Sequence, residues 1–319
     1  MQKPIDVFIT GACGMVGSHM LEMLAARKLS VVGSYYKPTV DLNEIKADAP
    51  LIECDVRYPN MLEQIIEKYR PKKIFHLAAQ SYPVVSWTYP NETMHTNANG
   101  TINVFEAVKK VREKDSTYDP MVVVACSSAQ YGASIKDTIV TEEAAFLPLH
   151  PYGVSKVAQD LLSYQYFVND GIRTIRARIF NTTGPRKVND VVSDFSSRVV
   201  DIEKGKLKKL RVGNLTTRRA ILDVSDLINA LVLLSDKGQP GEAYNICGEK
   251  VFLMADIIKM MNQIVGFDIQ YEQDSALMRK TDEPIILGDT QKLKDATGWS
   301  QQVSFEDTIK RVIAYYRAK

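Results

Sequence analysis

The chain has 319 residues and is 45% hydrophobic, which suits one large α/β domain or such a domain with a smaller lobe. Its 40 Lys and Arg against 38 Asp and Glu leave a formal charge of +2 without long single-sign blocks, so composition argues against nucleic acid or a membrane surface as partner. Four scattered cysteines, with no leader sequence and no apolar run of about 18 residues, predict a cytoplasmic protein with a small-molecule partner.

The first 180 residues alternate short aliphatic runs with amphipathic stretches. The expected strands are IDVFIT, LSVVGSYY, LIECDV, KKIFHLAA, MVVVACSS and TIRARIFN, and the expected helices cover 15–28, 60–69, 92–113 and 152–170. Continuous Val and Ile runs between helices are typical of parallel strands buried on both faces. The pattern therefore predicts a Rossmann-like, doubly wound parallel sheet.

The pattern becomes less regular after Gly184-Pro185. A helix is expected near 190–204, followed by the strand LKKLRVG, the stretch RAILDVSDLINALVLLSDK, the strand AYNIC and mostly helix to the end. We expect a dinucleotide-binding domain of residues 1–180 with an interleaved segment near 221–247. Residues 181–220 and 248–319 are expected to form a smaller mixed α/β lobe over the carboxyl edge of the sheet, where ligands bind in such folds.

Glycines follow the first strand at GxxGxxG spacing, at Gly11, Gly14 and Gly17. Such glycines permit a tight turn, close approach of a pyrophosphate and close helix packing, and the helix that Met15 and Val16 open directs N–H groups at the anion. The strand and helix around the triplet predict a dinucleotide site, the alternative being an ordinary glycine turn.

The choice between NADP and NAD depends on the end of the second strand, which reads Gly33-Ser34-Tyr35-Tyr36-Lys37. An acidic residue that would bind a ribose 2′-hydroxyl is missing, and Lys37 could attract a 2′-phosphate, which favours NADP. NAD stays open, with Lys37 as a solvated loop lysine. Asp55 follows the third strand and is expected either to accept from adenine or to cap a turn.

Tyr152 and Lys156 lie four residues apart at the start of a helix, and Ser127 ends the preceding strand. An ammonium beside a phenol favours phenolate, so we expect the Tyr152 pKa to fall below its usual value of about 10. Ser127 could hold the substrate oxygen with which Tyr152 exchanges a proton. A surface Tyr/Lys pair is the alternative. His76, inside a buried strand, is expected to be a core histidine, and no metal site is predicted.

With these residues, the chain resembles the extended short-chain dehydrogenase/reductase superfamily over essentially its whole length. The supporting motifs are GxxGxxG, HLAAQS at 76–81, TNANGT at 96–101, Ser127 with Tyr152 and Lys156, and RIFNTTGPRK at 178–187. PYGVSKVAQDLLSYQY, FNTTGPR and RKTDEPIILGDTQKLKDATGW are most similar to the branch of GDP-mannose 4,6-dehydratases and GDP-4-keto-6-deoxymannose reductases.

The resemblance implies Ser127, Tyr152 and Lys156 as catalytic residues. The implied cofactor contacts are Gly11, Gly14, Met15, Val16, Gly17, Tyr36, Asp55, Val56, Leu77, Ala78, Ala79, Asn97 and Lys156. The implied contacts to a nucleotide sugar are Gln80, Ser81, Ser128, Asn181, Arg186, Arg219, Arg279 and Asp282. Among these, Asn97 would support the active-site helix or a water chain near Lys156, and the arginines would bind a diphosphate.

The resemblance also indicates which reaction to expect. In the dehydratases, an acidic residue two positions before the tyrosine of the strand-end motif serves the elimination of water, and here that position is Ala129. Alanine cannot transfer a proton, and neither Gln130 nor Ser128 is a competent base here. We therefore expect hydride transfer at C4 of a GDP-linked hexose or heptose, as a 4-keto reductase or 4-dehydrogenase of polysaccharide biosynthesis.

Several alternatives remain at this point. Three other functions are each compatible with parts of the pattern: a 4,6-dehydratase that recruits Gln130 or a substrate-borne acid, a sugar epimerase, and a dinucleotide-sensing protein without turnover. The family pattern R-D-aromatic is replaced by Arg219-Ala220-Ile221, which weakens an expected ion pair and leaves Arg218 as an alternative to Arg219. The helices at 92–113 and 152–170 are expected to form a four-helix bundle in a homodimer, with a tetramer as a further option, or simply to pack on the sheet.

Overall fold

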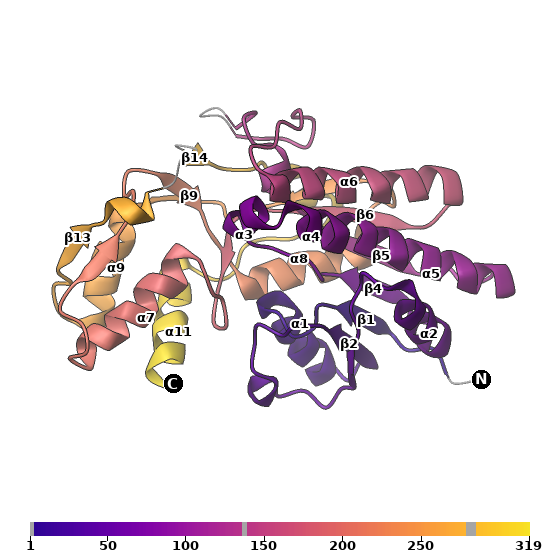
Figure 1. The fold of residues 1–319 in the computed structure, drawn as a ribbon, viewed down its shortest axis with the longest axis horizontal. Coiled ribbons are helices and arrows are strands. Elements are labelled where there is room, and N and C mark those ends of the chain that lie inside the picture. The colour runs from indigo at the N-terminus through magenta and orange to yellow at the C-terminus, as the bar shows by residue number, and fades with distance from the viewer. Residues whose placement is uncertain (1–2, 136–138, 279–284) are drawn as a thin grey trace.

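The computed structural model describes residues 3–135, 139–278 and 285–319, and its main element is one seven-stranded sheet (Figure 1). The strands are β1 (Val7–Thr10), β2 (Val31–Tyr35), β3 (Leu51–Glu53), β4 (Lys73–His76), β5 (Met121–Ser127), β6 (Thr174–Ile179) and β11 (Ala243–Ile246). All neighbouring pairs are parallel, in the order β11-β6-β5-β4-β1-β2-β3. The predicted Rossmann-like sheet is confirmed, and its carboxyl edge carries the ends of β1, β4 and β5 together.

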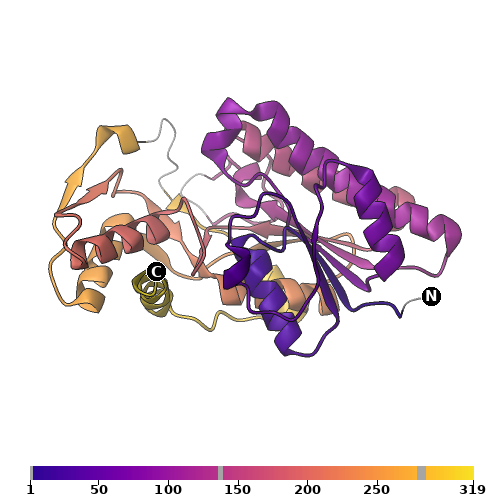
Figure 2. The ribbon, with the colours of Figure 1, turned by 60° about the horizontal axis from the view of Figure 1, so that its bottom comes forward.

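Helices lie on both faces of the sheet (Figure 2), and a hydrophobic core fills the space between the sheet and the helices on each face. One contains side chains from α1 (Met15–Ala26), α8 (Val224–Lys237) and α10 (Gln291–Thr297). The other contains side chains from α2 (Pro59–Tyr69), α5 (Gly100–Lys114) and α6 (Pro151–Asp170). Because each strand is packed on both faces, its aliphatic run is continuous rather than alternating.

The helix expected over 92–113 is not regular. It begins as α4 (Pro90–Met94), passes through a π-helical turn at His95–Asn99 and continues as α5. A short helix α3 (Pro83–Thr88) precedes it. Such π turns are uncommon and often occur at functional sites; here the turn carries Asn97, which is fully buried.

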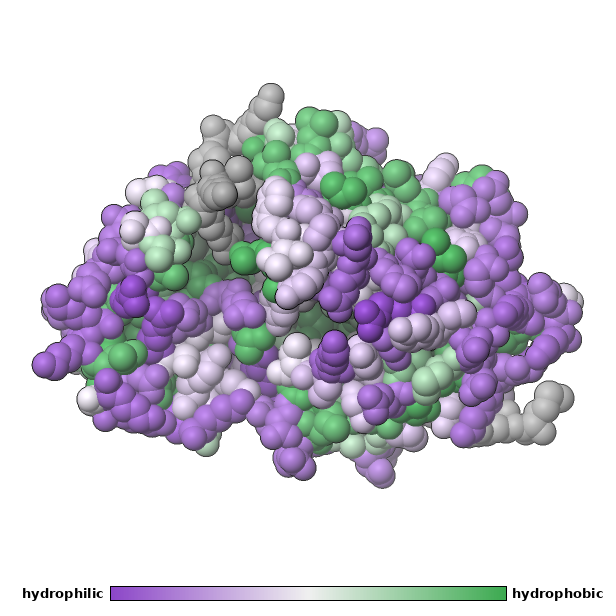
Figure 3. Space-filling view, in the orientation of Figure 1, coloured by the Kyte–Doolittle hydropathy of each residue, from purple (hydrophilic) through white to green (hydrophobic). Residues whose placement is uncertain are grey.

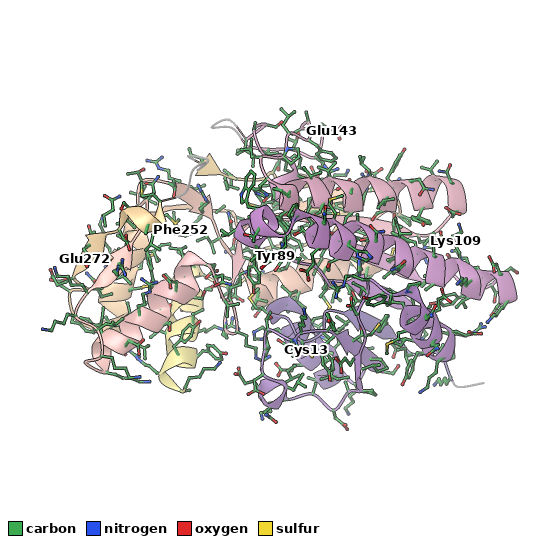
Figure 4. The ribbon with its side chains drawn as sticks, viewed as in Figure 1. Cys13, Tyr89, Lys109, Glu143, Phe252 and Glu272 are labelled. Atoms are coloured by element: carbon green, nitrogen blue, oxygen red, sulfur yellow. The ribbon has the colours of Figure 1, made fainter. Side chains whose placement is uncertain are left out.

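A smaller lobe stands beside the sheet and has its own core. Its elements are α7 (Val191–Glu203), β8 (Leu210–Val212), β9 (Arg218–Ala220), β12 (Val251–Leu253), α9 (Met254–Val265), β13 (Tyr271–Gln273), β14 (Ile285–Ile286) and α11 (Phe305–Arg317). The short strands β7 (Thr182–Thr183) and β10 (Leu222–Asp223) pair with each other, and Leu222 belongs to the core of the larger domain. Figure 4 labels Phe252 and Glu272 in this lobe and Cys13 in the larger domain.

The stretch around α10 packs with the larger domain. Leu293 on α10 and Trp299 belong to the core beneath the sheet, with α8 and Tyr244, and not to the core of the lobe. The Trp299 indole donates to the carbonyl oxygen of Asp226 at 3.1 Å, which anchors this stretch to α8. No described helix is both long and apolar enough to cross a membrane.

Candidate active site

The turn between β1 and α1 has the geometry of a pyrophosphate site. Gly11 adopts a φ of +70°, and a Cβ there would lie 2.8 Å from Ala78 Cα, so a larger residue fits neither the conformation nor the space. A Cβ on Gly17 would lie 2.2 Å from the Gly11 carbonyl oxygen. Gly14 caps α1 without a side-chain hydrogen bond, which leaves the first-turn N–H groups for an anion. The residues present therefore fit the phosphates of a dinucleotide.

The adenosine end of this site would lie at β2 and β3. Asp55 receives hydrogen bonds from the Arg57 side chain at 2.6 to 3.0 Å, and the Arg57 guanidinium lies 5.4 Å from the centre of the Tyr36 ring. Burial acts to raise the Asp55 pKa, but hydrogen bonding to Arg57 outweighs it and lowers that pKa. Lys37 also lies over Tyr36, at 5.4 Å. Two cations therefore flank the predicted position of the ribose.

The three predicted catalytic residues meet at the carboxyl end of β5. The Ser127 hydroxyl accepts from the Ala129 N–H at 3.2 Å, and it lies close enough to the Tyr152 phenol to act against the rise of the Tyr152 pKa. The Lys156 ammonium lies 5.7 Å from the centre of the Tyr152 ring. His150 accepts the Gly153 N–H at 3.0 Å through Nδ1 and so caps α6, and its ring stacks on Tyr152. This cap fixes the first turn of the helix, from which Tyr152 projects.

The direction of the Tyr152 pKa shift differs from the expectation. Burial raises the Tyr152 pKa to about 12, and the hydrogen bond from Ser127 only partly offsets this. Burial lowers the Lys156 pKa to about 8. The sequence shows the two charges as neighbours but not the depth of the helix start, and the cost of desolvation is larger here than the attraction between ammonium and phenolate. The phenol therefore keeps its proton at neutral pH.

Asn97 holds the loop after β4 against α6. Its side-chain oxygen accepts the Gln80 N–H at 2.8 Å, and its amide nitrogen donates to the Gln80 carbonyl at 3.0 Å and to Ser155 Oγ at 2.8 Å. Of the two roles expected for Asn97, these contacts match support of the active-site helix. Gln80 directs its own amide to Tyr82 and Thr93, at 3.1 and 2.9 Å, so its described contacts are structural.

The sequence analysis did not identify the two hydrogen-bond acceptors of the Lys156 ammonium. Nζ donates to the Ala125 carbonyl oxygen at 2.7 Å and to Gln159 Oε1 at 2.6 Å. Gln159 stands three residues after Lys156 on one helix, a spacing that places two side chains together. The helical spacing could therefore have indicated the contact between Gln159 and Lys156, although a glutamine by itself does not indicate such a role.

The Gln130 side chain is bonded to α6. It is fully buried, and its amide nitrogen donates to Asp160 Oδ2 at 3.0 Å. Asp160 also accepts from Arg178 at 2.8 Å and from Arg176 at 2.8 Å. Burial acts to raise the Asp160 pKa, but the two arginines and Gln130 outweigh it and lower that pKa. This buried cluster fixes the turn after Ser127 against α6.

The substrate residues expected from the resemblance occupy different settings. Asn181 has a buried amide nitrogen without a hydrogen-bond partner among the described residues, which suits a polar ligand. Arg186 instead donates to both oxygens of Glu22, at 2.8 and 2.9 Å, so a diphosphate would have to displace that carboxylate. Arg219 is buried on β9 and donates to the Arg218 carbonyl at 2.8 Å.

The remaining expected residues are placed as follows. Ser81 is exposed and Ser128 is partly buried in the short turn after β5. Arg279 and Asp282 lie outside the described residues. Val56, Leu77, Ala78 and Ala79 line the loops after β3 and β4, and the Ala78 N–H donates to Thr10 Oγ1 at 3.2 Å.

The geometry can be compared with known proteins. The family model for GDP-mannose 4,6 dehydratase matches residues 8–312. The chain is 27% identical to GDP-6-deoxy-D-mannose reductase of Pseudomonas aeruginosa, covering 98% of this chain and 97% of that protein. It is 27% identical to GDP-mannose 4,6 dehydratase 2 of Arabidopsis thaliana, with 96% and 85% covered.

Solved structures show the same fold. RMD from Pseudomonas aeruginosa complexed with NADPH superposes with a TM-score of 0.82 at 25% identity, covering 98% of this chain and 99% of that one. UDP-glucose 4-epimerase from Thermotoga maritima has a TM-score of 0.88 at 24% identity, with 98% and 99% covered, a likeness of fold alone. The match of the family model over nearly the whole length shows that the chain belongs to the GDP-mannose 4,6 dehydratase family.

Proposed function

We propose that this NAD(P)-dependent nucleotide-sugar oxidoreductase is a 4-keto reductase acting on a GDP-linked sugar. The observation that carries the proposal is the placement of Tyr152 beside Lys156 and the end of β5, where Ser127 lies and where position 129 is alanine. Burial favours the protonated form of the phenol by raising the Tyr152 pKa. The similarity to a GDP-6-deoxy-D-mannose reductase supports the choice of nucleotide and reaction. The neighbour bound to NADPH and the cations near Tyr36 favour NADPH as donor.

The reaction adds a hydride to C4 and a proton to O4, so the ketone is reduced to an alcohol while the cofactor is oxidised. Bound NAD(P)H supplies the hydride. Ser127 donates a hydrogen bond to the ketone oxygen, and Tyr152 transfers its phenolic proton to that oxygen as charge develops there. The Lys156 ammonium stabilises the resulting phenolate, which takes a proton back from solvent.

The elimination of a dehydratase needs a group that moves a proton at C5 or C6. Ala129 cannot do so, and Gln130 is buried against Asp160, so the dehydratase alternative that recruits Gln130 loses its support. The relatives include dehydratases and a 2-epimerase as well as a reductase, and analysis of the product separates these activities.

Replacing Tyr152 by Phe tests the proposed roles. The variant keeps the ring in place but has no proton to give, so turnover should fall by about 10²-fold or more, with dinucleotide affinity unchanged. NADPH fluorescence titration measures binding and absorbance at 340 nm measures turnover. Undiminished turnover would remove Tyr152 from the mechanism. Loss of both properties would leave the site unassigned and would point to misfolding, which circular dichroism detects.

We also propose that two copies of the chain pair through α6. Figure 3 shows apolar side chains gathered over this helix, and the exposed ones are Val154, Leu161, Tyr164 and Val168. Their spacing places them along one side of the helix, as a bundle with a second copy requires. Light scattering of a Leu161→Glu variant, expected to be monomeric, tests this pairing.

The four buried thiols support the proposed cytoplasmic location.

A further inference from the structure

We infer that Gln159 is a positioning residue for Lys156, and that it ends a buried polar chain which starts beneath the phosphate-binding turn. This inference rests on the proposed function, because it assumes that Lys156 acts during turnover. The chain runs from Lys156 through Gln159, Thr101 and His76 to Thr10, and every link is a hydrogen bond of 3.1 Å or less. Thr10 directly precedes Gly11.

The first link fixes the orientation of the Gln159 amide. An ammonium can only donate, so the group 2.6 Å from Lys156 Nζ must be the amide oxygen. The amide nitrogen then points to Thr101 Oγ1 at 2.7 Å, where it donates. The flipped amide would set its N–H groups against the ammonium and is excluded by charge.

The second link fixes the tautomer of His76. The Thr101 hydroxyl donates its hydrogen to the Asn97 carbonyl oxygen at 2.7 Å, so Thr101 can only accept hydrogen bonds from its other neighbours. His76 therefore carries its hydrogen on Nε2 and donates it to Thr101 at 3.1 Å. Its Nδ1 accepts from the Thr10 hydroxyl at 2.8 Å, and Thr10 accepts the Ala78 N–H.

The assigned bonds converge on Thr101, which accepts from Gln159 on one side and from His76 on the other. Burial, followed by the nearby Lys156 charge, lowers the His76 pKa to about 3, so the ring stays neutral and keeps its hydrogen on Nε2. Gln159 is thus held at both ends, by Lys156 and by Thr101. The amide can hold the ammonium in one place because its own position is fixed from the sheet.

Gln159 also bears on the charge of Lys156. The titratable groups around that ammonium are Tyr152 on α6, Cys126 on β5 and His76 on β4, with Asp160 on the next turn committed to Arg178. The thiol is buried, which raises the Cys126 pKa well above its usual value and keeps it neutral. Among the described residues, the ammonium is therefore stabilised by two neutral acceptors, the amide oxygen of Gln159 and the carbonyl oxygen of Ala125, and not by a carboxylate.

Two substitutions of opposite chemistry test this role. Gln159→Leu removes the acceptor at similar size, so Lys156 should lose its proton more easily. Gln159→Glu puts an anion against the ammonium and should retain the proton to higher pH. The readout is the alkaline limb of kcat for ketone reduction, which should move down by about one pH unit in the leucine variant and up by about one in the glutamate variant.

The effects on kcat and on NADPH affinity should also differ. Because Gln159 is fully buried and its bonds are all within the protein, kcat should fall about tenfold in the leucine variant while NADPH affinity stays within about twofold. Gln64→Leu is the matched control, since Gln64 lies exposed on α2, outside the face of α6 proposed for pairing, and should leave the pH profile unchanged.

Shifts of the same sign in both variants, or an unchanged profile in folded variants, would overturn the inference. If the leucine variant does not fold, the upward shift of the glutamate variant decides alone. Lys156→Met distinguishes failure of the proposed function from failure of the positioning role of Gln159. Full turnover in that variant would refute the proposed function itself, whereas loss of turnover with normal Gln159 variants would refute only the positioning role.

Discussion

The buried Lys156 ammonium should make the stability of this protein rise at alkaline pH, and Lys156→Met should remove that rise. The side chain is only 3% exposed, and burial lowers the Lys156 pKa from 10.5 to about 8. In the unfolded chain the lysine regains its ordinary pKa. Below pH 8 both states hold the proton, and the folded state bears the whole cost of the buried charge, on the order of 3 kcal/mol.

The sign of the effect follows from proton binding. Between pH 8 and 10.5 the unfolded chain holds this proton and the folded chain does not, so the free energy of unfolding rises with pH. Methionine carries no proton and contributes no such slope. The wild-type free energy of unfolding minus that of Lys156→Met should therefore increase by about 2 kcal/mol between about pH 7.5 and 9.5.

Urea unfolding followed by tryptophan fluorescence at several pH values measures this difference. The slope is informative even though methionine leaves Gln159 and Ala125 without their donor, because that loss is the same at every pH. Lys250→Met, at an exposed position, is the control and should give a difference that does not change with pH. A flat or falling difference for Lys156→Met would refute the assignment of a lysine with a lowered pKa.

Two other substitutions have definite expected outcomes. Asp160→Asn leaves Arg178, which is 4% exposed, without its anion, and should lower the free energy of unfolding by about 3 kcal/mol or more, measured by urea unfolding; an unchanged midpoint would contradict a structural role for this cluster. Gly17→Ala would place a Cβ 2.2 Å from the Gly11 carbonyl oxygen and should abolish NADPH binding in a fluorescence titration, whereas normal affinity would show that the turn does not hold the phosphates.

The features that the sequence predicted well are those that depend on local pattern. The glycine turn after β1 and the alternation of strands and helices follow from spacing and composition, and both are confirmed. Ser127, Tyr152 and Lys156 could be brought together from the sequence because Ser127 ends β5, and Tyr152 and Lys156 share one face at the start of α6, the next long helix in the chain.

The features that the sequence did not predict depend on tertiary distance and depth. Arg186 pairs with Glu22, 164 positions away, and no local pattern indicates that partner. The Tyr152 pKa rises because α6 begins inside the protein, which spacing between residues does not reveal. Helical spacing could have predicted that Gln159 contacts Lys156. It could not have predicted the support that Gln159 receives from Thr101 and His76, which lie on other elements.

The most direct test of hydride transfer without elimination is the product formed from two substrates. With GDP-4-keto-6-deoxymannose and NADPH that carries deuterium at the position from which the hydride is transferred, we expect an alcohol with one deuterium at C4. With GDP-mannose and NADP we expect no loss of water. A 4-keto-6-deoxy product from GDP-mannose, detected by mass spectrometry, would contradict hydride transfer without elimination.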